Sequence, residues 1–219
     1  MITEMAIQKK PKYIIGIDEV GRGPLAGPVA VCAFKMPILF NVKQFGKRRD
    51  SKKLTPEKRE EIFCVLKKLR GNPRGGASAY RGSTSGILGI DYCVSYESAK
   101  KIDAIGISRA IKNCLEKSLK KLNVKPHECQ VLLDGGLKAP SIYKNQKTII
   151  KGDEKEWAIA FASIVAKVSR DALMCRLAKK YPKYCFEIHK GYGTKKHCEL
   201  IRKCGLSNEH RKCFCKNFA

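Results

Sequence analysis

Short runs of strand-forming residues that stop at acids recur along the chain, at residues 13–17, 130–133 and 148–152. Apolar, β-branched runs of this length predict strands that are buried on both faces. The carboxyl ends of neighbouring strands meet at one edge of an open α/β sheet, which is where such sheets bind their ligands. We therefore expect the acids that follow the three runs to lie together at that edge. These acids are Asp18, Glu19, Asp134 and Asp153.

Longer segments with apolar residues at helical spacing alternate with these strands. The apolar residues between Ile107 and Leu122 share one helical face, and residues 157–166 are apolar nearly all round, which predicts a buried helix. This alternation favours an α/β protein of one domain, with or without a small appendage. The further predicted strands are 29–34 and 92–96, and the predicted helices are 56–70, 98–122, 154–180 and 195–204.

A loop rich in glycine and proline follows the first two acids, at residues 21–28. Such a loop exposes its backbone N–H and C=O groups and lets another chain approach closely. The alternative interpretation is that Asp18 and Glu19 only cap a strand in a tight surface turn. A second loop, at residues 71–86, is rich in Gly, Ser and Arg, which predicts a flexible surface segment.

The balance of charge indicates a polyanionic partner. The 219 residues include 45 Lys and Arg against 20 Asp and Glu, which gives a formal net charge of +25 and a pI near 9.7. No apolar run approaches the roughly 18 residues of a membrane span. Residues 1–12 also lack the apolar core of a signal peptide. We therefore expect a soluble, cytoplasmic protein with no membrane contact and with nucleic acid as its partner.

The four acids are costly on so basic a protein unless a cation lies among them. Mg²⁺ or Mn²⁺ fits this need, because these ions take carboxylate and water ligands and bridge to phosphate oxygens. Two such ions about 4 Å apart can activate a water and stabilise the leaving oxygen of a displacement at phosphorus. The acids therefore predict metal-dependent phosphodiester hydrolysis. The sequence contains neither the GxSxG motif of a serine nucleophile nor the GK[ST] ending of a P-loop.

Eleven cysteines are scattered through the predicted helices and strands. An odd number in that arrangement indicates reduced thiols that act as small apolar residues, not a disulfide framework. A zinc site near the C-terminus stays open as an alternative, although the CxxC pair of structural zinc sites is absent there. Its candidate ligands are His197, Cys198, Cys204, His210, Cys213 and Cys215.

Six motifs together resemble those of ribonuclease HII, the type 2 ribonucleases H of bacteria. The arginine between the two glycines of the first motif is typical of ribonuclease HII and not of its HIII relatives. The motifs are IGIDEVGRGPLAGPV at 15–29, DSKKL at 50–54, LLDGG at 132–136, KGD at 151–153, ASIVAKVSRD at 162–171 and HKGYGTKKH at 189–197.

The resemblance implies an α/β ribonuclease H-like fold, with a central mixed β-sheet flanked by helices and a small helical C-terminal part. We expect the catalytic domain at residues 1–180, and a C-terminal loop, helix and basic tail packed on it at residues 181–219. Asp171 lies in the family's AKVxRD motif but not at a metal ligand, and we expect it to pair with Lys167. The family's catalytic, metal-binding carboxylates fall on Asp18, Glu19, Asp134 and Asp153, which would hold one or two Mg²⁺ or Mn²⁺ ions.

The resemblance also implies the substrate, since family members act on RNA/DNA hybrids and on ribonucleotide-containing duplex DNA. They cut the RNA strand of the hybrid and nick DNA 5′ of a single ribonucleotide, leaving 3′-hydroxyl and 5′-phosphate ends. Recognition of the ribose 2′-hydroxyl falls on the backbone of Gly21, Arg22 and Gly23 together with Tyr192. Further contacts to phosphate are expected from Ser51, Lys52, Lys53 and Lys190.

Two alternatives to this activity stay open at the level of the sequence. One is a basic nucleic-acid-binding protein without catalysis, in which the acids are structural and the charge supplies nonspecific affinity. The other is a different metal nuclease that acts on DNA or structured RNA. We expect a monomer, and the sequence indicates no protein partner.

Overall fold

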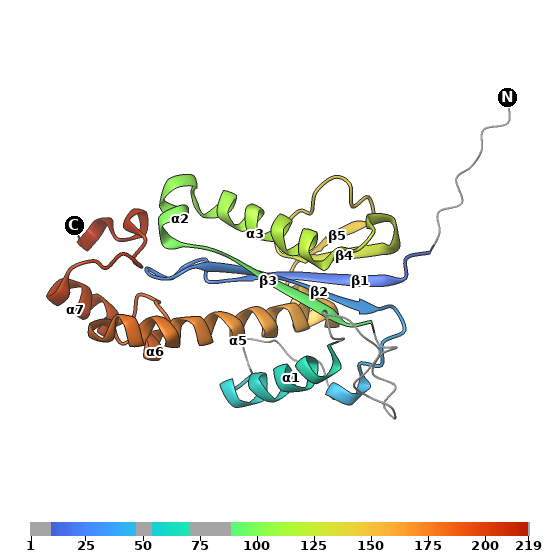
Figure 1. Ribbon diagram of the computed structural model, residues 1–219, viewed down its shortest axis with the longest axis horizontal. Helices are drawn as coiled ribbons and strands as arrows, with labels where there is room; N and C mark the ends of the chain where they lie inside the picture. The colour runs from blue at the N-terminus through green and yellow to red at the C-terminus, as the bar shows by residue number, and fades with distance from the viewer. Residues whose placement is uncertain (1–9, 47–53, 71–88, 219) are drawn as a thin grey trace.

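A five-stranded mixed sheet forms the centre of the computed structural model, which describes residues 10–46, 54–70 and 89–218 (Figure 1). Neighbouring strands follow the order β3-β2-β1-β4-β5. Strands β1, β4 and β5 run parallel, whereas β2 is antiparallel to β1 and β3. The three strands predicted to carry the acids are therefore neighbours, as expected. The bounds are β1 Tyr13–Val20, β2 Val29–Pro37, β3 Asp91–Glu97, β4 Cys129–Asp134 and β5 Gln146–Ile149.

Helices cover both faces of the sheet (Figure 1). Helices α2 and α3 lie on one face, and α5 lies on the other face with α1 packed on its outer side. The short helices α6 and α7 gather at the far end of α5, together with the C-terminal segment. The bounds are α1 Pro56–Leu69, α2 Ala99–Ile105, α3 Ile107–Leu122, α4 Gly152–Lys155, α5 Trp157–Lys180, α6 Phe186–His189 and α7 Lys195–Cys204.

Alternation of side chains along the strands builds a core on each face. Ile17 of β1 and Val31 of β2 pack on the α3 side, where Leu115 belongs to the apolar stripe predicted from the sequence and is buried. Phe34 of β2 points to the other face, and its ring centroid lies 5.3 Å from that of Phe161 in α5. The same alternation directs even-numbered residues of β1 toward α5 and odd-numbered residues toward α3.

Glycine at position 16 lets α5 lie directly on β1. A Cβ atom at Gly16 would lie 2.0 Å from the carbonyl carbon of Ala158 and 2.4 Å from the nitrogen of Ile159. No side chain fits there unless the helix moves. The first turn of α5 is thereby held against β1, and the short helix α4 that precedes it is held beside β4.

Strand β1 is longer than predicted. It continues through Asp18 and Glu19, which still pair with residues of β2. The two acids therefore belong to the strand itself, whereas the sequence had predicted that they follow its end. Their pairing with β4 has already ended, because the last paired residues of β1 and β4 are Ile17 and Leu133.

Two predicted helices are also interrupted. The helix expected at 98–122 is broken at Gly106, whose φ of 79° lies outside the helical region, so it forms α2 and α3. Asp153 does not end a strand, because β5 stops at Ile149 and Lys151 turns the chain with a φ of 54°. Asp153 instead lies in α4, and the long buried helix begins only at Trp157.

Other local predictions are confirmed. The Thr55 hydroxyl accepts a hydrogen bond from the Lys58 N–H at 3.3 Å and caps α1. All eleven cysteines lie within the described residues and carry free thiols. Burial raises the pKa of the Cys114 thiol to about 12, which keeps this thiol protonated. No helix in the described part of the chain is long and apolar enough to cross a membrane, and the loop predicted at 71–86 falls outside that part.

Candidate active site

Two carboxylates meet where strands β1 and β4 separate. The strands pair in parallel as far as Ile17 and Leu133, so the next residues, Asp18 and Asp134, lie level with each other. Both occupy strand positions that face α5, because Ile17 and Leu133 belong to the core on the opposite side. The structure thus brings together two of the acids that the sequence singled out.

Asp18 is almost fully buried, at 5% exposed. This burial raises the pKa of Asp18 well above its ordinary value, and the charges of Glu19 and Asp134 raise it further, against hydrogen bonds from Ser163 and the Glu19 N–H. The Glu19 N–H donates to Asp18 Oδ1 at 2.8 Å. A cation beside Asp18 would offset both the lost hydration and the repulsion from its neighbours.

Glu19 has one satisfied carboxylate oxygen and one unsatisfied oxygen. Its Oε1 pairs with Arg22 Nη1 at 3.0 Å. Its Oε2 is buried and has no hydrogen-bond partner in the described part of the chain. A buried acceptor left in this state costs about 1–3 kcal/mol. The donor set therefore fits a hard cation such as Mg²⁺ or Mn²⁺, which takes carboxylate oxygen ligands.

Asp134 and Asp153 are linked through Gly152. The Gly152 N–H donates to Asp134 Oδ1 at 2.7 Å. A Cβ atom at Gly152 would lie 2.5 Å from Ile159 Cδ1 and 3.3 Å from Asp134 Oδ1, so glycine permits the close approach of α4 to β4. Asp153 is the next residue and is buried, which places it at the same end of the sheet as Asp134.

As the side chains lie, residues 10–46, 54–70 and 89–218 contain no group of three or more Asp, Glu, His or Cys side chains arranged to hold a metal ion. Hydrogen bonds and ion pairs within the protein hold these carboxylates in their present orientations. Arg22 pairs with Glu19, and the Gly152 N–H holds one oxygen of Asp134. Coordination of a common cation would require Glu19 to turn partly away from Arg22, whereas the Gly152 N–H occupies only one oxygen of Asp134.

The buried guanidinium of Arg211 holds the loop of residues 21–28. It donates to the carbonyl oxygens of Gly21 at 2.7 Å, Arg22 at 2.9 Å and Gly27 at 3.0 Å. The N–H groups of Arg22 and Gly23 donate to no protein group within the described ranges, and a Cβ atom at Gly23 would meet nothing within 4 Å. These two N–H groups are therefore available to a ligand, in agreement with the exposed backbone that the sequence predicts.

A second buried arginine, Arg170 of α5, supports the other side of the same loop. It donates to the carbonyl oxygens of Pro28 at 2.9 Å, Ala26 at 3.3 Å and Lys190 at 3.0 Å. Burial, followed by the charge of Arg170, lowers the pKa of Arg211 to about 10. The two positively charged guanidinium groups thus lie beneath the loop and bind its carbonyl oxygens.

Tyr192 lies beside this loop because residues 189–193 dock on it. The carbonyl oxygen of Gly191 accepts from the N–H groups of Leu25 at 2.8 Å and Ala26 at 3.2 Å. The Tyr192 ring is 39% exposed, and the Lys167 ammonium lies 5.7 Å from its centroid. The exposed ring can stack on a sugar or a base.

Three buried histidines lie under Tyr192. His197 Nδ1 lies 2.9 Å from the carbonyl oxygen of Tyr192, His197 Nε2 lies 3.1 Å from His210 Nε2, and the His189 ring stacks on that of His197. A carbonyl oxygen can only accept, so His197 carries its proton on Nδ1 and its Nε2 accepts from His210. Burial lowers the pKa of both His197 and His210 to about 4, which keeps the pair neutral at neutral pH.

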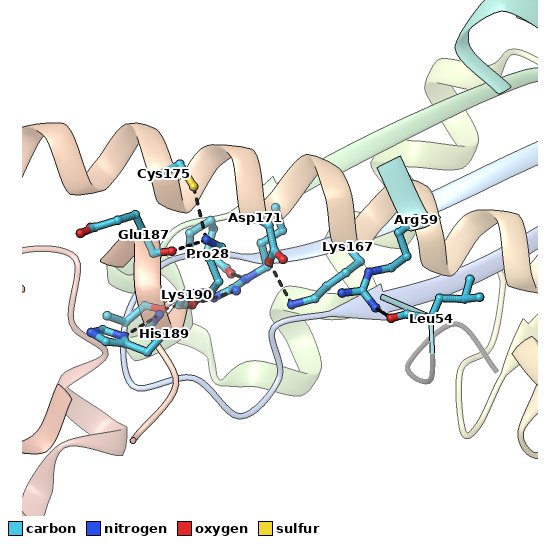
Figure 2. A network of polar contacts seen from close by, with 12 residues as sticks. Pro28, Leu54, Arg59, Lys167, Asp171, Cys175, Glu187, His189 and Lys190 are labelled. Carbon is cyan, nitrogen blue, oxygen red and sulfur yellow. Dashed lines mark hydrogen bonds and ion pairs between the residues drawn. The ribbon is translucent and has the colours of Figure 1, made fainter. Parts of the chain in front are cut away.

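The residues predicted to contact phosphate are placed only in part. The ammonium of Lys190 lies between Cys175 Sγ, at 3.4 Å, and the carbonyl oxygen of Glu187, so its charge is turned toward α5 and α6 (Figure 2). The predicted ion pair of Lys167 with Asp171 is confirmed at 3.0 Å (Figure 2). Outside the described residues lie Ser51, Lys52 and Lys53.

A cavity of about 670 Å³ opens on the α3 side of the acids. Its wall includes Arg22, whose guanidinium pairs with Glu19, and Gly136, two positions after Asp134. Lys112 of α3 and Lys138 add positive charge to the wall. These positive side chains can attract a negatively charged chain and hold it close to the carboxylates.

Sequence reasoning missed the residues that support the two loops. No role was predicted for Arg170 or Arg211, and His210 was named only as a candidate zinc ligand, yet all three side chains are buried. The sequence offered one signal for each group: Arg170 follows the apolar residues 157–166, and His210 and Arg211 follow a segment that contains Cys198 and Cys204. These signals do not identify partners that are backbone carbonyl oxygens.

Comparison with solved structures defines the class of fold as that of the ribonucleases H. The ribonuclease H2 from Pyrococcus horikoshii OT3 matches with a TM-score of 0.67 and 23% sequence identity, over 94% of this chain and 96% of that chain. Bst-RNase HIII in complex with Mn²⁺ matches with a TM-score of 0.61 and 16% identity, over 100% of this chain and 74% of that chain. The predicted ribonuclease H-like fold is confirmed.

Sequence comparison identifies the family within this class. The family model for ribonuclease HII matches residues 15–219. The ribonuclease HII of Caldicellulosiruptor bescii is 40% identical over 216 residues, which cover 99% of this chain and 93% of that protein. The chain therefore belongs to the ribonuclease HII family and is a nuclease of the ribonuclease H type.

Proposed function

We propose that this protein hydrolyses the RNA strand of RNA/DNA hybrids and nicks duplex DNA 5′ of a single ribonucleotide, giving 3′-hydroxyl and 5′-phosphate ends. One observation carries this proposal. The buried carboxylate of Asp18 lies level with Asp134 and next to Glu19, whose Oε2 has no hydrogen-bond partner in the described part of the chain. With Asp153, these acids would hold one or two Mg²⁺ or Mn²⁺ ions, and the solved relative Bst-RNase HIII is described with Mn²⁺.

When bound, a divalent ion supplies a Lewis acid for the phosphate and lowers the pKa of a coordinated water. The protein contributes fixed orientation. Asp18 is held by the N–H of Glu19, and Asp134 is held by the N–H of Gly152, so both carboxylates are oriented before a substrate arrives. Such pre-orientation lowers the cost of bringing the reacting groups together.

The loop of residues 21–28 and Tyr192 would supply recognition of the ribose. The N–H groups of Arg22 and Gly23, which have no protein acceptor in the described part of the chain, and the exposed ring of Tyr192 would contact the ribose from adjacent loops. The 2′-hydroxyl is the group that distinguishes RNA from DNA at such a site. A nick beside one ribonucleotide begins its removal from DNA, so the activity would serve ribonucleotide excision repair and DNA replication in the cytoplasm, with the protein as a monomer.

Cleavage of a labelled DNA duplex that contains one ribonucleotide tests the proposal, with and without Mg²⁺ and beside the all-DNA duplex. The variant Asp134→Asn keeps an oxygen for the Gly152 N–H but removes a charge. We expect it to cut at least about 100-fold more slowly, which is about 2.7 kcal/mol of activation free energy. Asp91→Asn is the matched control, because Asp91 pairs with Arg70 at the start of β3.

Each result has a distinct meaning. A metal-dependent nick 5′ of the ribonucleotide, absent from the all-DNA duplex and from Asp134→Asn, would support the proposal. Cutting of a long RNA/DNA hybrid without a nick at the single ribonucleotide would keep the carboxylate chemistry and refute the roles of Gly23 and Tyr192. Binding without cleavage of either substrate would refute the catalytic proposal.

A further inference from the structure

A short segment near the C-terminus, residues 207–211, packs against the loop of residues 21–28; we call this segment the C-terminal clamp. Ala26 and His210 form an isolated antiparallel bridge. The Gly27 N–H donates to the carbonyl oxygen of Glu209, and the Arg211 N–H donates to that of Leu25, both at 2.8 Å. The loop is therefore paired along its inner edge with a segment from the other end of the sequence.

Arg211 determines which way two peptide groups of the loop face. Its guanidinium binds the carbonyl oxygens of Gly21 and Arg22. In a planar trans peptide the C=O and the following N–H point in opposite directions. The N–H groups of Arg22 and Gly23 therefore point away from Arg211, and they are the same N–H groups that have no protein acceptor within the described ranges.

His210, the neighbour of Arg211, reaches the other half of the site. It donates from Nε2 to His197, which in turn donates from Nδ1 to the carbonyl oxygen of Tyr192. The Nδ1 atom of His210 accepts from the N–H of Ser207 at 2.9 Å, so the chain of hydrogen bonds begins within the C-terminal clamp itself. The adjacent side chains of Arg211 and His210 thus hold the loop of residues 21–28 and the loop of residues 189–193 in a fixed position relative to each other.

The burial of Arg211 is costly for a purely structural residue. Its side chain is fully buried, and it forms no ion pair in the described part of the chain. A buried charge that is offset only by carbonyl oxygens loses more hydration than a neutral side chain would. What this arrangement gains is five donors in a fixed plane, three of which bind carbonyl oxygens of one loop.

We propose that Arg211 and His210 are positioning residues for recognition of the ribose 2′-hydroxyl: Arg211 turns the N–H groups of the loop toward the ribose, and His210 fixes Tyr192 beside them. The inference rests on the proposed function of this site. Neither residue contacts the substrate, and each acts through the backbone of another segment.

The test is the ability of the protein to distinguish a DNA duplex with one ribonucleotide from the same all-DNA duplex, measured as the ratio of their two Kd values. Fluorescence anisotropy in Ca²⁺ or EDTA gives both values without cleavage. One hydrogen bond to the 2′-hydroxyl predicts a ratio of about 2 to 12 for the wild-type protein, and a second bond would raise it further. Arg211→Lys keeps the charge but cannot bind three carbonyl oxygens, so the ratio should fall close to one while the Kd for all-DNA duplex stays within about twofold.

Arg202→Lys is the matched control, because Arg202 lies exposed on α7 in the same region, and its ratio should equal that of the wild type. A merely structural role lowers the folded fraction, or both affinities together, and leaves the ratio unchanged. An unchanged ratio in folded Arg211→Lys would therefore overturn the proposal. If Arg211→Lys does not fold, His210→Ala decides: a lowered ratio that His210→Gln partly restores supports the proposal, and an unchanged ratio overturns it.

A failure of the proposed function would look different. It would give a ratio of one for the wild-type protein itself, with no nick at the ribonucleotide, and the role of the C-terminal clamp in recognition would fall with it. A wild-type ratio above one that survives in the Arg211 and His210 variants would remove the positioning role alone.

Discussion

The contact of β1 with α5 makes Gly16→Ala a direct test of how the fold holds the carboxylates. The added Cβ atom would lie 2.0 Å from the carbonyl carbon of Ala158. Carbon atoms in contact need about 3.5 Å, so α5 would have to move by about 1.5 Å. Overpacking costs about 1–3 kcal/mol, and a clash with backbone belongs at the upper end of that range. At roughly 2–4 °C per kcal/mol for a chain of this length, the Tm should fall by about 6–12 °C.

The same displacement should slow catalysis, because α5 carries Ser163, which hydrogen-bonds Asp18. A misplacement of about 1 Å can cost about 100-fold in rate. Thermal unfolding followed by circular dichroism gives the Tm, and single-turnover cleavage below the transition gives the rate of the folded variant. Gly136→Ala is the control for stability, because its Cβ atom would meet nothing within 4 Å. A Tm for Gly16→Ala within about 2 °C of wild type would refute the packing argument, since that is the scatter of surface substitutions.

Two further predictions concern stability. Acid should weaken the fold through His197 and His210, because the unfolded chain binds protons near pH 6.5 whereas the folded pair does so only near pH 4. The contribution is complete above pH 6.5 and is lost as the pH falls toward 4; at about 1.4 kcal/mol per pKa unit, the loss should be about 3 kcal/mol for each of the two histidines. Urea unfolding across this range measures the loss, which should be smaller in His210→Gln; equal losses in both proteins would contradict the assignment. Ser118→Ala removes a buried hydroxyl that donates to the carbonyl oxygen of Val31 at 3.0 Å, so the urea midpoint should fall by the equivalent of about 1 kcal/mol, and an unchanged midpoint would argue against this bond.

The sheet could be predicted from the sequence because its signals are local. Each strand that carries an acid is an apolar run that ends at a polar residue, and parallel neighbours bring such ends together. The interruptions could not be predicted as readily. Gly106 lies inside a segment with helical periodicity, and nothing in that periodicity reveals a φ of 79°. Lys151 adopts a left-handed conformation that is uncommon for a residue with a side chain, and this turn moves Asp153 from a strand into α4.

The residues of the candidate site also fall into a group that the sequence could predict and a group that it could not. Asp18, Glu19 and Asp134 could be found because acids at strand ends are unusual and lie close to apolar runs. The supporting residues Arg170 and Arg211 could not, because their partners are backbone carbonyl oxygens, which every residue carries. A side chain that recognises backbone leaves no trace in the sequence of the segment that it binds.

The bonds from Arg211 to the loop of residues 21–28 join positions that lie 184 to 190 residues apart. A ribosome releases the first acids and the loop early, whereas the guanidinium that orients the loop emerges after nearly all the rest of the described chain. On the proposed role of Arg211, a nascent chain gains the ability to distinguish ribose from deoxyribose only after residue 211 has left the ribosome. Proteolytic cleavage after Leu206 would remove Arg211 and, with it, this discrimination.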